Sequence, residues 1–110
     1  MAKKSARSSA DRILRENRLP RRHLQYGALC YRKKGKKVEI LLVTSRGTRR
    51  WLAPKGWPIR GKGPAGTAAQ EAWEEAGVKG RVTGDSVGVY TYRKHLPKGR
   101  SMTCVVELFP

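Results

Sequence analysis

The chain has 110 residues, of which 25 are Lys or Arg and 8 are Asp or Glu, so its formal net charge is +17 at pH 7. This length suits one domain with a modest core, and no run approaches the roughly 18 apolar residues that a membrane-spanning helix needs. A charge this positive indicates a polyanionic substrate or partner.

The first 21 residues, MAKKSARSSADRILRENRLPR, predict a basic flexible arm. The first nine are expected to be disordered, and residues 10–19 to form a short helix around Ile13, Leu14 and Leu19. Because the arm has no apolar core of the signal-peptide type, we expect a cytoplasmic protein. A basic, serine-containing arm can also imitate an organelle transit peptide, but its acidic residues and weak amphipathicity argue against that alternative.

Two apolar segments follow the arm. QYGALCYR (25–32) and VEILLVTSR (38–46) predict strands, the second of them buried. YRKKGKK (31–37) lies between them and predicts a hairpin turn exposed to solvent. Cys30 and Cys104 both lie in apolar runs without metal-ligand spacing, which indicates reduced core residues rather than a disulfide.

The next segment, WLAPKGWPIRGKGPAG (51–66), is rich in Gly and Pro and predicts a turn-rich connection. It carries the cations Lys55, Arg60 and Lys62, which can hold phosphate oxygens. Pro64 then suits the first position of a helix, and Gly77 suits its C-terminal cap. Between them lies a stripe of small residues: Ala65, Ala68, Ala69, Ala72 and Ala76. Trp51 and Trp73 are assigned to the core or its rim.

Three of the eight acidic residues in the chain, Glu71, Glu74 and Glu75, fall at i, i+3 and i+4 on one face of this helix. Like charges at this spacing cost about 0.2–0.5 kcal/mol per pair, and carboxylates near a helix C-terminus oppose its dipole by about 0.3–1 kcal/mol each. Such a row is commonly a solvated polar face. In so basic a chain it favours a cation site, and oxygen ligands of this kind suit Mg2+.

The last part of the chain predicts a long hairpin. GRVTGDSVGVYTYRK (80–94) alternates as a half-exposed strand does, and SMTCVVELFP returns after a turn, so the hairpin covers 86–109. Tyr90 and Tyr92 are assigned to the sheet surface rather than to a ligand platform. His23 and His95 are isolated, and neither is expected to bind metal.

The span from Gly56 to Val78 resembles the Nudix box, whose family pattern is G-x5-E-x7-R-E-U-x-E-E-x-G-U, with U a bulky apolar residue. The matching residues, without a gap, are Gly56, Glu71, Glu74, Glu75, Gly77 and Val78. Lys62 stands in place of the first Glu, Gln70 stands in place of the Arg, and Ala72 is small for its apolar position.

The resemblance covers roughly residues 22 to 109, and we take 22–110 as one Nudix domain. QYGALCYR, VEILLVTSR and RWLAPKGWP are similar to the subgroup of diphosphoinositol polyphosphate and diadenosine polyphosphate hydrolases. The resemblance implies an α/β fold, an α/β/α sandwich with a mixed sheet. It also implies hydrolysis of a diphosphate bond in a small polyphosphorylated substrate with Mg2+ or Mn2+.

The resemblance also implies roles for individual residues. Glu74 and Glu75 would be direct metal ligands, and Glu71 a ligand or a group that helps to activate water. Ser45 and Arg46 match a Ser-Arg pair that contacts phosphates in the inositol-type enzymes. The residues expected to bind substrate are therefore Ser45, Arg46, Lys55, Gly56, Arg60 and Lys62.

The departures from the family pattern keep other functions open. Gln70 carries no charge with which to orient a carboxylate, and Lys62 either weakens a further metal or contacts phosphate itself. The domain is expected to lack the family's last strand and helix, and an uncovered apolar sheet face favours a homodimer. Two alternatives are a catalytically impaired Nudix-like domain that binds a phosphorylated ligand, and a basic protein that binds nucleic acid non-specifically.

Overall fold

The computed structural model describes residues 6–45, 47 and 49–110. Over this part of the chain the helices are α1 (Ala6–Glu16) and α2 (Pro64–Ala76), with the short 3-10 helices η1 (Arg21–His23) and η2 (Pro97–Gly99). The strands are β1 (Leu24–Ala28), β2 (Tyr31–Lys34), β3 (Lys37–Ile40), β4 (Val43–Thr44), β5 (Trp51–Leu52), β6 (Lys55–Gly56), β7 (Gly88–His95) and β8 (Ser101–Phe109). None of the helices in these residues is long and apolar enough to cross a membrane.

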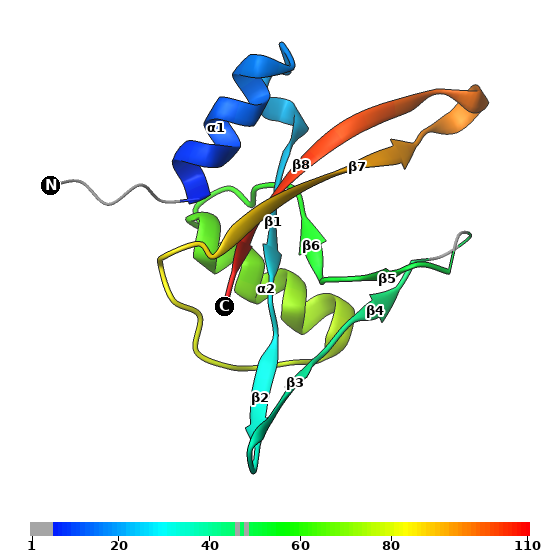
Figure 1. The fold of residues 1–110 in the computed structure, drawn as a ribbon. Helices are drawn as coiled ribbons and strands as arrows, with labels where there is room; N and C mark the ends of the chain where they lie inside the picture. The colour runs from blue at the N-terminus through cyan, green and yellow to red at the C-terminus, as the bar shows by residue number, and fades with distance from the viewer. Residues whose placement is uncertain (1–5, 46, 48) are drawn as a thin grey trace, which may run out of the picture.

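Four strands form the central sheet, in the order β6-β1-β8-β7 (Figure 1). β1 runs parallel to β8, beginning with Leu24 opposite Val105, whereas β6 and β7 are antiparallel to their neighbours. β7 and β8 form the hairpin that the alternation over 86–109 predicts. The predicted α/β class and the mixed sheet are therefore confirmed.

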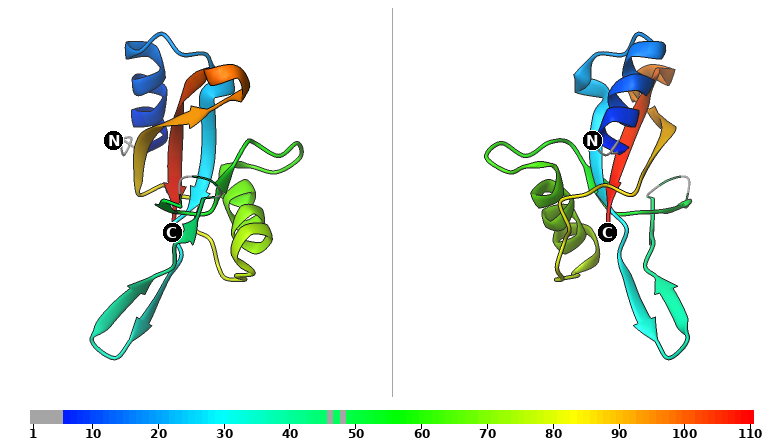
Figure 2. Two further views of the ribbon diagram at one scale, coloured as in Figure 1. Left: turned by 90° about the vertical axis from the view of Figure 1, so that its right-hand side faces the viewer. Right: turned by 60° about the vertical axis from the view of Figure 1, so that its left-hand side comes forward.

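The core lies where the two helices meet the sheet. α1 packs against β7 and β8, and α2 packs against β1 and β6, as both views of Figure 2 allow the reader to follow. The helices contribute small or aliphatic side chains to one cluster: Ala10 and Leu14 from α1, Ala68 and Ala72 from α2. The alanines allow the backbone of α2 to approach β1 closely, and every residue of β1 is buried.

The N-terminal segment is folded onto the sheet over the residues that the structure describes. α1 runs from Ala6 to Glu16, so a helix is present where one was expected around Ile13 and Leu14, and it lies within the arm expected over 1–21. Leu14 is only 3% exposed. The stabilisation from burying this apolar side chain, and others on the same face, offsets the entropy lost in ordering the segment. Residues 1–5 lie outside the described part of the chain.

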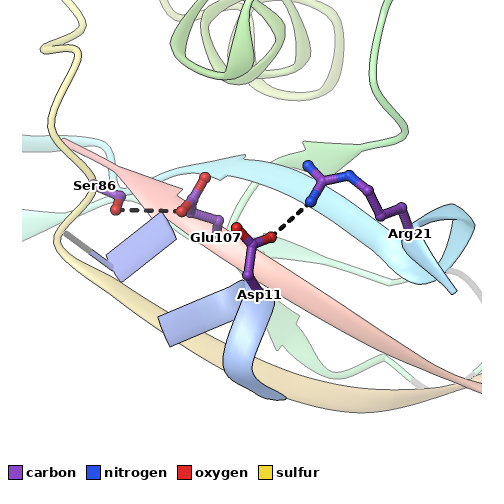
Figure 3. A network of polar contacts seen from close by, with 4 residues as sticks. All are labelled: Asp11, Arg21, Ser86 and Glu107. Carbon is purple, nitrogen blue, oxygen red and sulfur yellow. Dashed lines mark hydrogen bonds and ion pairs between the residues drawn. The ribbon is translucent and has the colours of Figure 1, made fainter. Parts of the chain in front are cut away.

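One ion pair also ties α1 to the segment that follows it: Asp11 of α1 contacts Arg21 at 2.6 Å (Figure 3). In the same region, Ser86 donates a hydrogen bond to the buried Glu107 of β8 at 3.5 Å. Val89 and Val105 belong to the same apolar cluster as Leu14. α1 thus covers part of the apolar surface that we expected to be bare, and the homodimer stays a prediction.

The buried strand expected over 38–46 is wrong. The segment divides into β3 and β4, which pair only with β2 and β5 in two separate two-stranded sheets. The β2–β3 hairpin extends away from the domain (Figure 1), and Val38 is 59% and Ile40 55% exposed. The apolar composition of the segment did not predict burial because no other described element covers this hairpin. The exposed basic turn expected over 31–37 is confirmed.

The cysteines and tryptophans differ in how far the fold buries them. Cys30 and Cys104 are both free thiols, as expected; Cys104 is buried, and partial burial raises the pKa of Cys30. Trp51 is 70% exposed, so its assignment to the core or its rim is wrong. Trp73 is 48% exposed and lies at the rim of the core.

Candidate active site

The acidic residues are carried by α2, whose ends are those that the sequence predicts. Pro64 occupies the first turn, and Gly77 is the C-cap at φ 66°, where its N–H bonds two carbonyls of the last turn. Glycine adopts this left-handed conformation with little penalty, so the helix ends there. Because the alanine stripe faces the core, Glu71 and Glu75 lie on the flank of α2 that is next to β6.

Glu71 and Glu75 are the two carboxylates that the fold brings together. Their side chains interact with each other, and this contact raises the pKa of Glu71 and lowers that of Glu75. Gly56 of β6 lies directly against this pair, and a Cβ atom at that position would collide with the Glu71 carboxylate. A side chain at position 56 would therefore displace the Glu71 carboxylate from its place beside the sheet, a role of Gly56 that the expected substrate contact did not include.

The surroundings of the pair weaken the preference of both carboxyl groups for the charged form. Burial, followed by the negative charges of Glu75 and Glu74, raises the pKa of Glu71 to about 6. Burial also raises the pKa of Glu75, but a backbone hydrogen bond from Lys55 and the charge of its ammonium group oppose that shift. The charged form of both carboxyl groups is therefore disfavoured without a cation, and a bound cation would favour it.

Lys55 is the cation nearest to this pair among the residues expected to bind substrate. Its ammonium nitrogen lies 4.6 Å from the centre of the Tyr92 ring. Burial lowers the pKa of Lys55, and the charge of Glu75 partly offsets that effect. The Tyr92 hydroxyl donates a hydrogen bond to the buried Gln25 at 2.7 Å, which holds the ring under the ammonium group.

Tyr90 is a residue of this site that the sequence did not point to. Its hydroxyl is buried and has no hydrogen-bond partner within the described residues. Burial, and then the charge of Glu75, raise the pKa of Tyr90 to about 12, so the phenol stays a neutral donor. The alternation of β7 indicated that Tyr90 and Tyr92 share a face, but only the fold places that face near α2.

Glu74 does not join the pair. It is exposed, and it accepts a hydrogen bond from Gln70 at 3.0 Å. Gln70 stands where the family pattern has Arg. Its amide group contacts the carboxylate of Glu74, one turn further along α2. The ligand role expected of Glu74 stays a prediction.

The donors present suit a hydrated Mg2+ ion. Within the part of the chain that the structure describes, no group of three or more His, Cys, Asp and Glu side chains is placed to hold a metal ion. Mg2+ is, however, commonly held by one or two carboxylates together with water and substrate phosphates. Glu71 and Glu75 fit that pattern, and a site that also includes Glu74 stays a prediction.

The other residues expected to bind phosphate lie apart from the acidic pair or outside the described chain. Ser45 follows β4, where its hydroxyl accepts a hydrogen bond from the Arg50 N–H at 3.1 Å, and Arg46 lies outside the described residues. Arg60 and Lys62 are exposed in the loop before α2. Lys62 packs beside α2 and lines a cavity that does not include the acidic pair.

A model of the NUDIX domain matches residues 21–108. The chain belongs to the Nudix family. The β6–α2 connection is therefore its Nudix loop and α2 its Nudix helix. The loop is anchored to the helix because the Ile59 N–H donates a hydrogen bond to the hydroxyl of Thr67, a fully buried residue, at 3.2 Å.

Two curated relatives show what this Nudix chain is similar to. Human diphosphoinositol polyphosphate phosphohydrolase 3-alpha is 36% identical over 80 residues, which cover 73% of this chain and 48% of the relative. Rat diphosphoinositol polyphosphate phosphohydrolase 2 is 38% identical over 69 residues, covering 61% of this chain and 38% of the relative. The chain thus matches about half the length, or less, of these curated relatives.

Solved structures agree on the fold. A C. elegans Ap4A hydrolase superposes with a TM-score of 0.56 at 26% identity, covering 78% of this chain and 65% of that one. A MutT/nudix family protein from Enterococcus faecalis superposes with a TM-score of 0.55 at 20% identity, covering 91% of this chain and 42% of that one. The second likeness concerns the fold alone.

Proposed function

We propose that the chain hydrolyses a diphosphate bond in a small polyphosphorylated molecule, and that the reaction depends on Mg2+. The observation that supports this most strongly is the placing of Glu71 and Glu75 side by side on the flank of the Nudix helix next to Gly56 and Lys55. The pair offers adjacent oxygen ligands for a cation, and Lys55 offers a partly desolvated cation for a phosphate oxygen.

The substrate class follows from the relatives and from the charge. The relatives include diphosphoinositol polyphosphate phosphohydrolases and an Ap4A hydrolase. These names share one substrate feature, a chain of linked phosphates on a larger group. The net charge of +17 raises the local concentration of such anions around the protein.

In this proposal the residues of the chain bind and orient the reactants. Glu71 and Glu75 hold the ion, which when bound offsets charge on the phosphoryl oxygens and lowers the pKa of coordinated water. Lys55 binds a neighbouring phosphate oxygen, in a partly buried position where the interaction is stronger than in bulk water. The Tyr90 hydroxyl donates its hydrogen bond to an oxygen of the phosphate chain.

The test is phosphate release from a panel of inositol pyrophosphates, dinucleoside polyphosphates and nucleoside diphosphate derivatives, with Mg2+, with Mn2+ and with a chelator. We expect metal-dependent turnover that falls roughly 100-fold or more in Glu75→Gln, the scale on which losing one charge-stabilising group acts. Glu16→Gln, at an exposed position on α1, is the matched control and should keep full activity. If folded Glu75→Gln kept full turnover, the reaction would not depend on Glu75 and the proposed site would be wrong.

A catalytically impaired domain that binds without cleaving is the second candidate. The observation that favours it is Gln70, an uncharged residue at the position of the family's Arg, whose side chain donates its hydrogen bond to Glu74. Calorimetric binding of a non-hydrolysable diphosphate by wild type, without turnover of any substrate in the panel, would support this function and exclude hydrolysis.

A further inference from the structure

The cavity that Lys62 lines lies on the flank of the Nudix helix opposite the acidic pair. Its volume is about 840 Å3, and its walls come from α2, the start of β2, the segment 78–82 and the end of β8. α2 contributes Gly66, Gln70 and Trp73 to the wall, whereas Glu71, Glu75 and Lys55 do not line it. The cavity is therefore separate from the acidic pair, with α2 as the wall between them.

The lining has an apolar floor and a cationic rim. Ala28, Ala72, Val82 and Phe109 supply apolar surface, and the charged residues that line the cavity are Arg32, Lys33, Lys62, Lys79 and Arg81. No described Asp or Glu side chain lines it. Such a lining suits a ligand with an apolar, planar part and negative charge at its edge.

Trp73 is the aromatic group at this rim. Its side chain is about half exposed, and the ammonium nitrogen of Lys79 lies 4.8 Å from the centre of its ring. Arg32 is paired with Glu39 at 2.7 Å, so the cations available to an incoming anion are those of Lys33, Lys62, Lys79 and Arg81. An aromatic surface beside several cations is the arrangement on which unpaired nucleic acid bases stack.

The cationic surface continues beyond the cavity along the β2–β3 hairpin. Lys33 belongs to both, and Lys34, Lys36 and Lys37 follow it at exposed positions of the hairpin. Figure 1 and Figure 2 both show this hairpin extending away from the sheet. A ligand that used all of these charges would need several phosphates in a row, more than the cavity alone would hold.

We propose that the cavity and the β2–β3 hairpin together bind single-stranded nucleic acid. One base enters the cavity against Trp73, and the phosphates that follow it lie along Lys33, Arg81 and the hairpin lysines. The cavity lies within the range of typical ligand pockets, about 300–1,000 Å3, and so has room for a nucleotide unit. A base inside a duplex is paired and stacked, so duplex would not fill the cavity. This binding is independent of the proposed hydrolysis.

The test measures binding of a labelled single-stranded RNA of about 12 nucleotides by fluorescence anisotropy in EDTA, which prevents metal-dependent cleavage. The variant K33E/R81E is compared with R22E/R100E, whose positions lie outside the cavity and the hairpin. Both variants lower the net charge equally, so a diffuse attraction would weaken equally in both. We expect K33E/R81E to lose at least about tenfold more affinity than the control.

A second comparison tests the stacking. Trp73→Ala should weaken binding roughly tenfold, whereas Trp73→Phe, which keeps an aromatic face, should retain most of the affinity. Circular dichroism checks that each variant is folded. Three results would each overturn the proposal. The two charge variants could lose equal affinity, or the protein could bind duplex RNA as tightly as the single strand. A mononucleotide or a fatty acid could also displace the oligonucleotide fully at an equal concentration.

Discussion

At the scale of single residues, the candidate active site brings opposite charges together: the carboxyl groups of Glu71 and Glu75 and the ammonium group of Lys55. Burial raises the pKa of Glu71 and Glu75 and lowers the pKa of Lys55, so each of these groups loses part of its preference for the charged form. A cation at the carboxylates and a phosphate at Lys55 would restore both charged forms. Under the proposed function, we therefore expect the site to bind a metal-bound phosphate more strongly than either ion alone.

Glu71 should make the stability of the metal-free protein depend on pH. Its pKa rises from 4.5 to about 6 on folding, so protonation stabilises the folded state. That contribution is complete below pH 4.5 and is lost as the pH rises through about 6. Glu71→Gln stays neutral throughout and should gain stability relative to wild type across this range. Urea unfolding of both proteins in a chelator at several pH values measures the difference in their free energies of unfolding. A difference that does not change with pH would contradict the raised pKa of Glu71.

Tyr90 should matter for turnover but not for stability. Its hydroxyl has no partner within the described residues, so Tyr90→Phe should leave the free energy of unfolding unchanged or slightly higher. We expect turnover to fall about tenfold, as for one hydrogen bond to a charged oxygen.

Tyr92→Phe is the matched control. It breaks the bond to the buried Gln25 and should cost about 1–3 kcal/mol of stability. Denaturant midpoints and initial rates separate the two substitutions. Equal destabilisation by both would show that Tyr90 is a structural residue.

At the scale of elements, α1 is part of the core and the β2–β3 hairpin is not. Ala10 and Leu14 of α1 pack with residues of β1 and β8, while the hairpin strands pair only with each other. The two segments have similar shares of apolar residues, so composition alone does not predict which of them is buried. What separates them is whether another element lies close enough to cover their apolar side chains.

Leu14→Ala tests the contribution of α1 to stability. Removing most of a buried leucine side chain should cost about 2–5 kcal/mol, because the transfer free energy is lost and a cavity is left. Arg15→Ala, next to it on the exposed face, should change stability by no more than about 0.5 kcal/mol. Guanidinium unfolding of both variants measures this, and similar values would mean that α1 does not contribute to the cooperative unit.

At the scale of the whole molecule, α2 separates the two surfaces that we propose to bind anions. One flank carries the carboxylate pair with Lys55, and the other faces the cationic cavity that contains Trp73. The proposed hydrolysis needs a metal ion, and the proposed binding of nucleic acid does not. Glu75→Gln should therefore leave RNA affinity unchanged, and K33E/R81E should leave the metal dependence of hydrolysis unchanged.

Some features of this protein follow from the sequence because they depend on neighbouring residues. The helix over 64–76 follows from Pro64 and Gly77, the hairpin over 86–109 from its alternation, and the Nudix family from acidic spacing within one helix. Each of these signals lies within a short stretch of chain. The fold class could be predicted for that reason, and the α/β architecture confirms it.

Other features depend on residues far apart in the chain. The tertiary structure decided that Glu71 pairs with Glu75 rather than with Glu74, because the alanine stripe sets which flank of α2 faces β6. It also placed Tyr90 near that pair, docked α1 on the sheet and left 38–46 uncovered. Spacing along one helix shows which side chains share a face. Only the packing of elements shows what that face meets.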